Sequence, residues 1–311
     1  MNPAKTILLF GASGLLGFEL SRALRNLGTV VAPSAAEVDV RQSEQVAAIV
    51  RQIRPAIIVN AVAWTDVDAA EQNQTAATLL NVQFCGQLVE CAKTTGALLV
   101  HFSSDYVFSG AGTTPWRETD CPQPVSVYGK TKFEADQLIT QSDVNYLIFR
   151  VSWLYGWRRR NFLLTFLRLA LTRHKLQMVS DQIGAPTPVW ALADAITGVL
   201  ASYLAAPQRW RQLYHLSAGG ESSWFGFATE ILRSMPALGM KPLLTMDNLQ
   251  PINTADYPSA AKRPLNSRLD CNKIAIEQRI ILPDWQKLLS DTFAQLPSLT
   301  SEQLPDFLRK E

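Results

Sequence analysis

Residues 124–139, "PVSVYGKTKFEADQLI", contain a tyrosine followed four positions later by a lysine, Tyr128 and Lys132. On a helix these two side chains project from the same face. A phenol, with a pKa of about 10, is a hydrogen-bonding acid at neutral pH, and a nearby ammonium lowers that pKa by stabilising the phenolate. Such a pair can deliver a proton to a ketone oxygen while hydride reaches the carbon. The same spacing also occurs by chance on solvated helices.

A serine hydroxyl is predicted to join this pair. The apolar run 97–104, "ALLVHFSS", ends at Ser104. Ligands of doubly wound sheets bind beyond the carboxyl ends of the strands, so we expect Ser104 and Tyr128 to meet in one cleft. Ser104 would hold the carbonyl oxygen, and Lys132 could also hydrogen-bond the nicotinamide ribose. Ser126 is expected to cap the helix that carries Tyr128 and Lys132.

A glycine motif predicts the hydride donor. In "TILLFGASGLLGFEL", Gly11, Gly14 and Gly17 lie between an apolar strand and a helix. The first glycine permits a tight turn, the second lets the backbone approach a pyrophosphate, and the third allows close helix–strand packing. The helix N-terminus favours phosphate groups. The motif therefore predicts dinucleotide binding, and its G-x-x-G-x-x-G spacing resembles that of the short-chain dehydrogenase/reductase superfamily.

The loop after the second strand favours NADPH over NADH, with NADH still possible. Pro33 and Ser34 stand where an acidic residue would normally bind the adenine-ribose 2′-hydroxyl, so nothing there should repel a 2′-phosphate. Asp39 in "EVDV" is expected to contact the adenine or its loop, and a loop-capping aspartate is nearly as good an interpretation.

Apolar runs alternate with helical patterns through the first half of the chain. Because the runs are apolar throughout, we expect an α/β fold, a Rossmann-type doubly wound parallel sheet covered on both faces. Ser43 is expected to cap the second helix. The predicted strands are 6–10, 29–32, 56–63, 97–104 and 145–152, and the predicted helices are 14–27, 43–53, 75–95 and 126–140.

The rhythm changes after residue 153, which predicts a second, smaller domain. Helices are expected at 161–173 and 189–204, a loop at 181–188 and a strand at 213–218, with proline-rich loops beyond 222. We therefore expect an NADP(H)-binding Rossmann domain of residues 1–153 plus about 187–219. A C-terminal substrate-binding domain would comprise about 154–186 plus 220–311.

Composition narrows the class of protein. The net charge of +2 over 311 residues predicts no nucleic-acid partner. No apolar run reaches the ~20 residues that span a membrane, and the N-terminal run is too short for a signal peptide, so we expect a cytoplasmic protein. The four cysteines form no C-x-x-C pair, and Cys85 and Cys91 are expected to be buried, reduced thiols on one helix. The oligomeric state is open between monomer and homodimer.

Seven blocks together resemble the dTDP-4-dehydrorhamnose reductases, which are extended short-chain reductases. They are "GASGLLGFEL", "IIVNAVAWTDVDAAE", "HFSSDYVFSG", "VYGKTKFEAD", "FRVSWLYG", "DQIGAPTP" and "KRPLNSRLD". The resemblance implies NADPH-dependent reduction of the C4 ketone of dTDP-4-dehydro-L-rhamnose, the last step in making dTDP-L-rhamnose.

The resemblance also implies roles for individual residues. Ser104, where the family often has threonine, Tyr128 and Lys132 match the catalytic positions. Asp105 and Trp153 match substrate-contacting positions, a core aromatic being the alternative for Trp153. Arg263 and Asn266 are predicted substrate contacts, and Asn81 resembles a structural asparagine that orders water near the lysine. The predicted cofactor contacts are Gly11, Ser13, Gly14, Leu15, Leu16, Gly17, Asp39, Val40, Ala61, Ala63, Thr65, Tyr128 and Lys132.

Two departures from the family pattern bear on ligands. Some members of the family bind Mg²⁺ between subunits through carboxylates. This chain keeps Glu19 but has Trp190 where a second carboxylate would be. Because Mg²⁺ requires oxygen ligands, no bound metal is expected. Arg158–Arg160 replace a small glycine-rich turn. They could hold the substrate's diphosphate, and a solvated charge run is the slightly preferred alternative.

Three other functions stay open at this point. The chain could reduce another dTDP-4-keto-deoxysugar, since pocket shape sets the substrate. Dehydratases and epimerases share the glycine loop and the Tyr–Lys pair, but Tyr106 stands where a dehydratase needs a second acid after Asp105. A non-catalytic, NADP-binding regulatory subunit is a further alternative, although this chain keeps both Tyr128 and Lys132.

Overall fold

The structure is a computed structural model that describes residues 5–206 and 210–296. Its centre is a parallel sheet of six strands in the order β10-β5-β4-β3-β1-β2. The predicted doubly wound sheet is thereby confirmed. Its strands are β1 (Thr6–Phe10), β2 (Thr29–Val31), β3 (Ile57–Asn60), β4 (Leu98–Ser104), β5 (Tyr146–Val151) and β10 (Arg211–His215).

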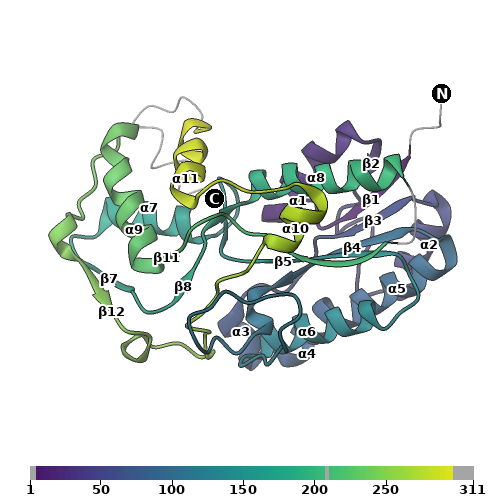
Figure 1. Ribbon diagram of the computed structural model, residues 1–311, viewed down its shortest axis with the longest axis horizontal. Coiled ribbons are helices and arrows are strands. Elements are labelled where there is room, and N and C mark those ends of the chain that lie inside the picture. Colours follow the sequence, from purple (N-terminus) through teal and green to yellow (C-terminus); the bar gives the residue numbers. More distant parts are fainter. Residues whose placement is uncertain (1–4, 207–209, 297–311) are drawn as a thin grey trace.

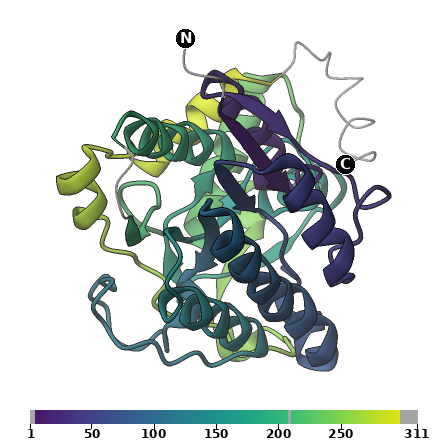
Figure 2. The same cartoon turned by 90° about the vertical axis from the view of Figure 1, so that its right-hand side faces the viewer.

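Helices cover both faces of this sheet, which explains why its inner strands are apolar throughout. Helices α1 (Leu15–Ala23) and α8 (Val189–Ala205) pack together on one face (Figure 1). On the other face lie α2 (Ser43–Ile53), α5 (Phe84–Thr95) and α6 (Val127–Thr140), and the turned view in Figure 2 shows helices on either side of the strands. Cys85 and Cys91 both lie buried and unpaired on α5, as predicted.

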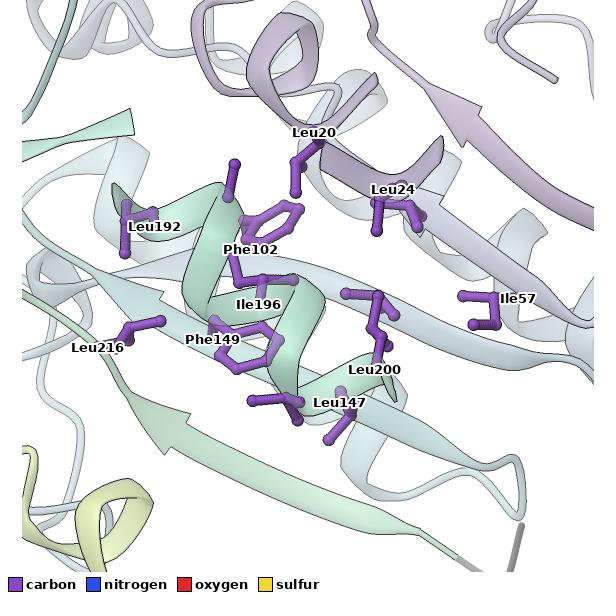
Figure 3. Close-up of a cluster of buried hydrophobic side chains, with 14 of the residues drawn as sticks. Leu20, Leu24, Ile57, Phe102, Leu147, Phe149, Leu192, Ile196, Leu200 and Leu216 are labelled. Atoms are coloured by element: carbon purple, nitrogen blue, oxygen red, sulfur yellow. The ribbon is translucent and has the colours of Figure 1, made fainter. Parts of the chain in front are cut away.

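The core between the sheet and α8 shows how the layers interlock. Leu192, Ile196 and Leu200 descend from successive turns of α8 onto the strands (Figure 3). They meet Phe102 of β4 and Phe149 of β5, whose rings stack with centroids 6.1 Å apart. Buried apolar area of this extent fixes the spacing of the strands, and therefore the positions of the residues that follow them.

Several predicted boundaries are wrong in detail. The third strand ends at Asn60, before Ala61–Ala63, and the last strand occupies 211–215, not 213–218. The predicted helix 75–95 is three pieces: α4 (Gln74–Thr78), a π-helical turn at Leu79–Gln83 and α5. Ser43 is the first residue of α2 and makes no capping bond, whereas Ser126 caps α6 as expected, accepting from the Gly129 N–H at 3.1 Å.

Beyond β5 a second hydrophobic cluster forms at the left end of the molecule in Figure 1. It packs α7 (Phe162–Thr172), α9 (Trp224–Ser234) and α11 (Trp285–Ala294) together. The remaining elements are α3 (Val67–Gln72), α10 (Asn272–Gln278), β6 (Leu154–Tyr155), β7 (Leu176–Val179), β8 (Ile183–Gly184), β9 (Thr187–Pro188), β11 (Ser222–Ser223) and β12 (Leu249–Ile252), with 3-10 turns at Leu24–Asn26, Asp105–Val107, Met235–Leu238, Met246–Asn248 and Thr254–Asp256. Among the described residues, three separate two-stranded sheets, β11-β8, β12-β7 and β6-β9, follow β5 in the chain. The proposed division into two domains stays a prediction.

Within the described ranges, no helix is both long and apolar enough to traverse a lipid bilayer.

Candidate active site

The glycine turn lies at the point where the strand order reverses, between β1 and β3. Gly11 has φ +87°, and a Cβ there would lie 2.7 Å from the carbonyl carbon of Ala61. A Cβ on Gly17 would lie 2.0 Å from the Gly11 carbonyl oxygen. Only glycine therefore permits this approach of the turn to β3 and α1. The cradle and the N-terminus of α1 fit the diphosphate of a dinucleotide, which binds at such reversal points in doubly wound sheets.

The other predicted cofactor residues come from three segments, and one of them, Ala61, directly contacts the glycine turn. Ser13 and Gly14 precede α1, and Leu15 and Leu16 form its first residues. The segment after β3 carries the remaining set: Ala61, Ala63 and the exposed Thr65, while Val40 packs against the core beneath α2. The sheet thus brings together two segments that are some fifty positions apart in the chain, because β1 and β3 are paired neighbours.

The loop after β2 is held by hydrogen bonds to two carboxylates. The Glu37 carboxylate accepts hydrogen bonds from the Ser34 N–H at 2.7 Å and from the Ser34 hydroxyl at 2.8 Å. That this loop accepts a 2′-phosphate stays a prediction. Asp39 caps its own loop, accepting from the Arg41 N–H and guanidinium, and the Arg41 hydrogen bonds lower the pKa of Asp39 to about 2.

Ser104 and Tyr128 come together at the carboxyl end of β4. Ser104 ends the strand, and its hydroxyl donates to Asp105 at 2.8 Å. Gly129 lets α6 press onto the turn that follows Ser104, because a Cβ there would lie 2.2 Å from the Tyr106 carbonyl oxygen. The ring of Tyr128, one residue earlier, then packs edge-on against Tyr106, with centroids 5.6 Å apart.

The phenol of Tyr128 is protonated near neutral pH. Burial raises its pKa to about 12, the charge of Asp105 also raises it, and a hydrogen bond with Ser104 opposes them. The expected lowering of this pKa by Lys132 is not found in the structure, since burial outweighs other influences and the Lys132 amine is directed toward strand β4. A neutral phenol is nonetheless the correct form for donating a proton.

Lys132 lies in a buried polar network that sequence reasoning missed. Its Nζ atom is 3.4 Å from Nε2 of His101, whose Nδ1 lies 3.2 Å from the Asn60 amide nitrogen. Because Asn60 Oδ1 accepts from the Val62 N–H, the amide nitrogen must face His101, and Nδ1 must accept. The proton of the neutral imidazole is thus on Nε2, the nitrogen beside Lys132. The signal in the sequence was a histidine within an otherwise apolar buried strand.

Burial and charge act in opposite directions on this lysine. Burial lowers the pKa of Lys132 to about 8, and the charge of Asp136 opposes the decrease. Asp136, one helical turn further along α6, accepts from the Arg150 Nε at 3.0 Å, and both side chains are at most 4% exposed. Burial together with the Lys132 charge lowers the pKa of His101 well below its usual value, so His101 is neutral.

Asn81 connects the cofactor segment to the catalytic helix. It lies in the π-helical turn before α5 and is 1% exposed. Its Oδ1 accepts from the Trp64 N–H at 2.8 Å, while its Nδ2 donates to the hydroxyl of Thr131 at 2.9 Å. Through these bonds the segment after β3 and the α6 turn that carries Lys132 keep a fixed separation, and the expected ordering of water by Asn81 stays a prediction.

Two predicted substrate residues, Asp105 and Trp153, lie in different surroundings. Asp105 is 2% exposed, and burial raises its pKa to about 6 against hydrogen bonds from Ser267 and Ser104. Trp153 follows β5 with the left-handed φ of +50° and stacks on Trp224 at 3.6 Å between ring centroids. A Cβ on Gly184 would lie 2.7 Å from the Trp153 ring, so glycine at 184 is what admits the indole.

Arg263 and Asn266 occupy the loop that joins the two hydrophobic clusters. Arg263 forms an ion pair with Asp68 of α3 at 2.6 Å, which places its guanidinium near Tyr106. Asn266 is 1% exposed, and its amide nitrogen donates to the Thr114 carbonyl at 2.8 Å while its oxygen accepts from Arg268. The side chain of Asn266 is therefore engaged by the protein itself.

The departures from the family pattern have defined surroundings. Arg159 donates to the Ser13 carbonyl oxygen, and Arg158 lies over the Phe18 ring, so this part of the arginine run contacts the glycine turn and α1. Glu19 pairs with Arg22 at 2.8 Å. Trp190 donates to the Thr292 hydroxyl at 2.9 Å.

Comparison with known proteins gives the family. Residues 5–298 match the family described as RmlD substrate binding domain. The chain belongs to the RmlD family. A dTDP-4-dehydrorhamnose reductase from Shigella flexneri is 39% identical to it over 295 residues, covering 92% of this chain and 98% of the relative. The predicted resemblance is confirmed.

Solved structures of RmlD-type and related proteins share the fold. The dTDP-4-dehydrorhamnose reductase from Bacillus anthracis, solved in complex with NADP, superposes with a TM-score of 0.84 at 31% identity and covers 94% of this chain and 99% of its own. The dTDP-glucose 4,6-dehydratase DesIV from Streptomyces venezuelae has a TM-score of 0.76 at 19% identity, over 93% and 96% of the two chains, which shows the fold alone. Only the first of these two structures is therefore also close in sequence.

Proposed function

We propose that this chain uses NADPH to reduce the C4 ketone of dTDP-4-dehydro-L-rhamnose to dTDP-L-rhamnose. The observation that carries the proposal is the meeting of Ser104 and Tyr128 at the carboxyl end of β4. That end of the sheet also holds the glycine turn. The curated relatives named for this reaction align over nearly the whole chain.

NADPH supplies a hydride to the ketone carbon, and the side chains of the protein handle the oxygen. Tyr128, kept protonated by its raised pKa, donates its phenolic proton to the oxygen as negative charge develops there. The Ser104 hydroxyl holds the same oxygen in place. Lys132 would hydrogen-bond the hydroxyls of the nicotinamide ribose and so help to hold the cofactor.

The substrate residues follow from the same placement. Asp105 follows Ser104 directly and accepts a hydrogen bond from its hydroxyl, so we assign it a contact with the sugar beside the ketone. The Trp153 and Trp224 pair supports an apolar wall for the sugar. We assign Arg263 a substrate contact and Asn266 the task of holding its loop, because the Asn266 amide is already engaged.

The NADP complex of the Bacillus relative supports the preference for NADPH. The test of the proposal is loss of NADPH absorbance with dTDP-4-dehydro-L-rhamnose, compared with other dTDP-4-ketosugars and with NADH. Turnover of a different dTDP-4-ketosugar alone would change the substrate. Cofactor binding without any turnover would favour the regulatory alternative.

We also propose that the enzyme acts in the cytoplasm as a monomer or homodimer, without bound metal. Cell fractionation and light scattering of the purified protein test the first two points. Activity that survives dialysis against a chelator tests the third, since dependence on Mg²⁺ would contradict it.

A further inference from the structure

The arginine turn, residues 156–161, lies against the glycine turn although the two are far apart in sequence. Arg159 donates from Nε to the carbonyl oxygen of Ser13 at 2.8 Å. The guanidinium carbon of Arg158 lies 4.0 Å from the centroid of the Phe18 ring, on the first turns of α1. Two neighbouring cations therefore contact the segment that begins α1.

The arginine turn is held in this position by the rest of the fold. The Asn161 amide nitrogen donates to the carbonyl oxygens of Gly156, Arg158 and Arg159 at 2.8, 3.2 and 2.9 Å. The Trp157 indole donates to the Thr292 carbonyl of α11 at 2.9 Å. A Cβ at Gly156 would lie 3.3 Å from Leu15, so the turn approaches α1 closely. These contacts fix the backbone, and with it the place from which both arginines extend.

The charges here suit an anion. The first turn of α1 contains no acidic residue, and its N-cap, Gly14, offers no side-chain partner to the free N–H groups. An N-terminal helix turn already attracts phosphate, and guanidinium groups form paired hydrogen bonds with phosphate oxygens. The relative from Bacillus anthracis, which aligns along this chain, was solved with NADP.

We propose that Arg158 and Arg159 close over the diphosphate of the bound cofactor and so anchor it from the side of the substrate-binding elements. The inference rests on the proposed NADPH chemistry and replaces the earlier alternatives of a substrate diphosphate contact or a solvated charge run. Arg159 holds the Ser13 carbonyl through Nε, which orients its planar guanidinium across the turn. Arg158 is oriented by stacking on Phe18.

The test is cofactor affinity, measured by nicotinamide fluorescence without any sugar substrate. Arg158→Gln and Arg159→Gln are each expected to raise the Kd by roughly 10–100-fold, because each removes charge-assisted hydrogen bonds to phosphate. The loss should be equal for NADPH and NADH, since both carry the diphosphate. Arg160→Gln removes the same charge from the same turn and serves as the matched control, with a Kd expected within about twofold of wild type.

Each other outcome contradicts the proposal. A loss confined to NADPH would assign the arginines to the 2′-phosphate, and an unchanged cofactor Kd with a raised KM for the dTDP-sugar would assign them to the substrate. An equal cofactor Kd in wild type and the three variants would show that the arginines are a solvated surface run. Circular dichroism verifies that the variants are folded. If wild type fails to reduce the sugar while the variants still lose cofactor affinity, only the proposed function is wrong.

Discussion

The Nζ atom of Lys132 lies 3.4 Å from Nε2 of His101, and both side chains are at most 2% exposed. Strand β4 thus supplies Ser104 at its end and His101 three residues earlier, beneath the lysine. Burial lowers the pKa of Lys132 to about 8, so its ammonium form loses a proton more readily than that of an exposed lysine.

The pH dependence of activity should report this lysine. Its pKa is lowered to about 8, so the ammonium form predominates below that pH and is lost as the pH rises through it. With NADPH as the varied substrate, kcat/KM is expected to fall by about tenfold per pH unit above pH ~8. In Lys132→Arg the side chain stays charged, and this alkaline decline should disappear from whatever activity remains. Identical alkaline declines in the two proteins would assign it to another group.

Removing the phenol should separate chemistry from binding. Tyr128→Phe is expected to lower kcat by roughly 10²–10⁴-fold, because the proton donor is lost while the ring still packs against Tyr106. The Kd for NADPH, measured by fluorescence, should stay within about threefold of wild type. A Tyr128→Phe enzyme with normal turnover would sink the assignment of Tyr128 as the acid.

Helix α6 offers an unusual glycine test. Gly→Ala within a helix normally stabilises by about 0.5–1 kcal/mol. At Gly129 the added Cβ would lie 2.2 Å from the Tyr106 carbonyl oxygen, so Gly129→Ala should displace α6 and decrease both stability and turnover. Gly86→Ala in α5 is the matched control, because its Cβ would meet nothing nearer than a leucine methyl at 3.8 Å. Urea unfolding and NADPH oxidation measure both effects, and a stable, active Gly129→Ala protein contradicts the packing argument.

Removing one partner of the buried ion pair between Asp136 and Arg150 should destabilise the protein. Asp136 and Arg150 are 3% and 4% exposed, so Asp136→Asn leaves a buried guanidinium without its counter-charge. We expect a decrease of about 3–5 kcal/mol in the free energy of unfolding, measured in urea. The double variant Asp136→Leu/Arg150→Met, which removes both charges, should be closer to wild type. The stability lost by the double variant is compared with the losses measured for Asp136→Leu alone and Arg150→Met alone. If it equals the sum of those two losses, the two charges are not coupled.

Arg263 can be tested through its partner. If Arg263 contacts the substrate, Arg263→Gln should raise the KM for the dTDP-sugar by about tenfold or more and leave the NADPH Kd unchanged. Asp68→Asn keeps the cation but weakens the 2.6 Å contact that positions it, so its effect on KM should be smaller. Equal KM values for Arg263→Gln and wild type would leave Arg263 as a link between the loop and α3.

The sequence by itself determined the layers of this protein and the order of its strands along the chain. Uniformly apolar runs separated by helical patterns require a buried parallel sheet, and Gly11, Gly14 and Gly17 require a close turn at its first junction. Local spacing also placed Tyr128 and Lys132 on one helical face and Ser126 at its cap. These features depend on neighbours in the chain, so periodicity and turn chemistry suffice to find them.

Only the tertiary structure decided which distant groups meet. The pKa of Tyr128 rises because packing of α6 on the Ser104 turn buries the phenol, a desolvation that no local pattern encodes. The lowered pKa of Lys132 and the arginines at the glycine turn likewise depend on contacts between segments far apart in the chain. Burial and charge act through space, and the distances between such groups are set only when the chain folds.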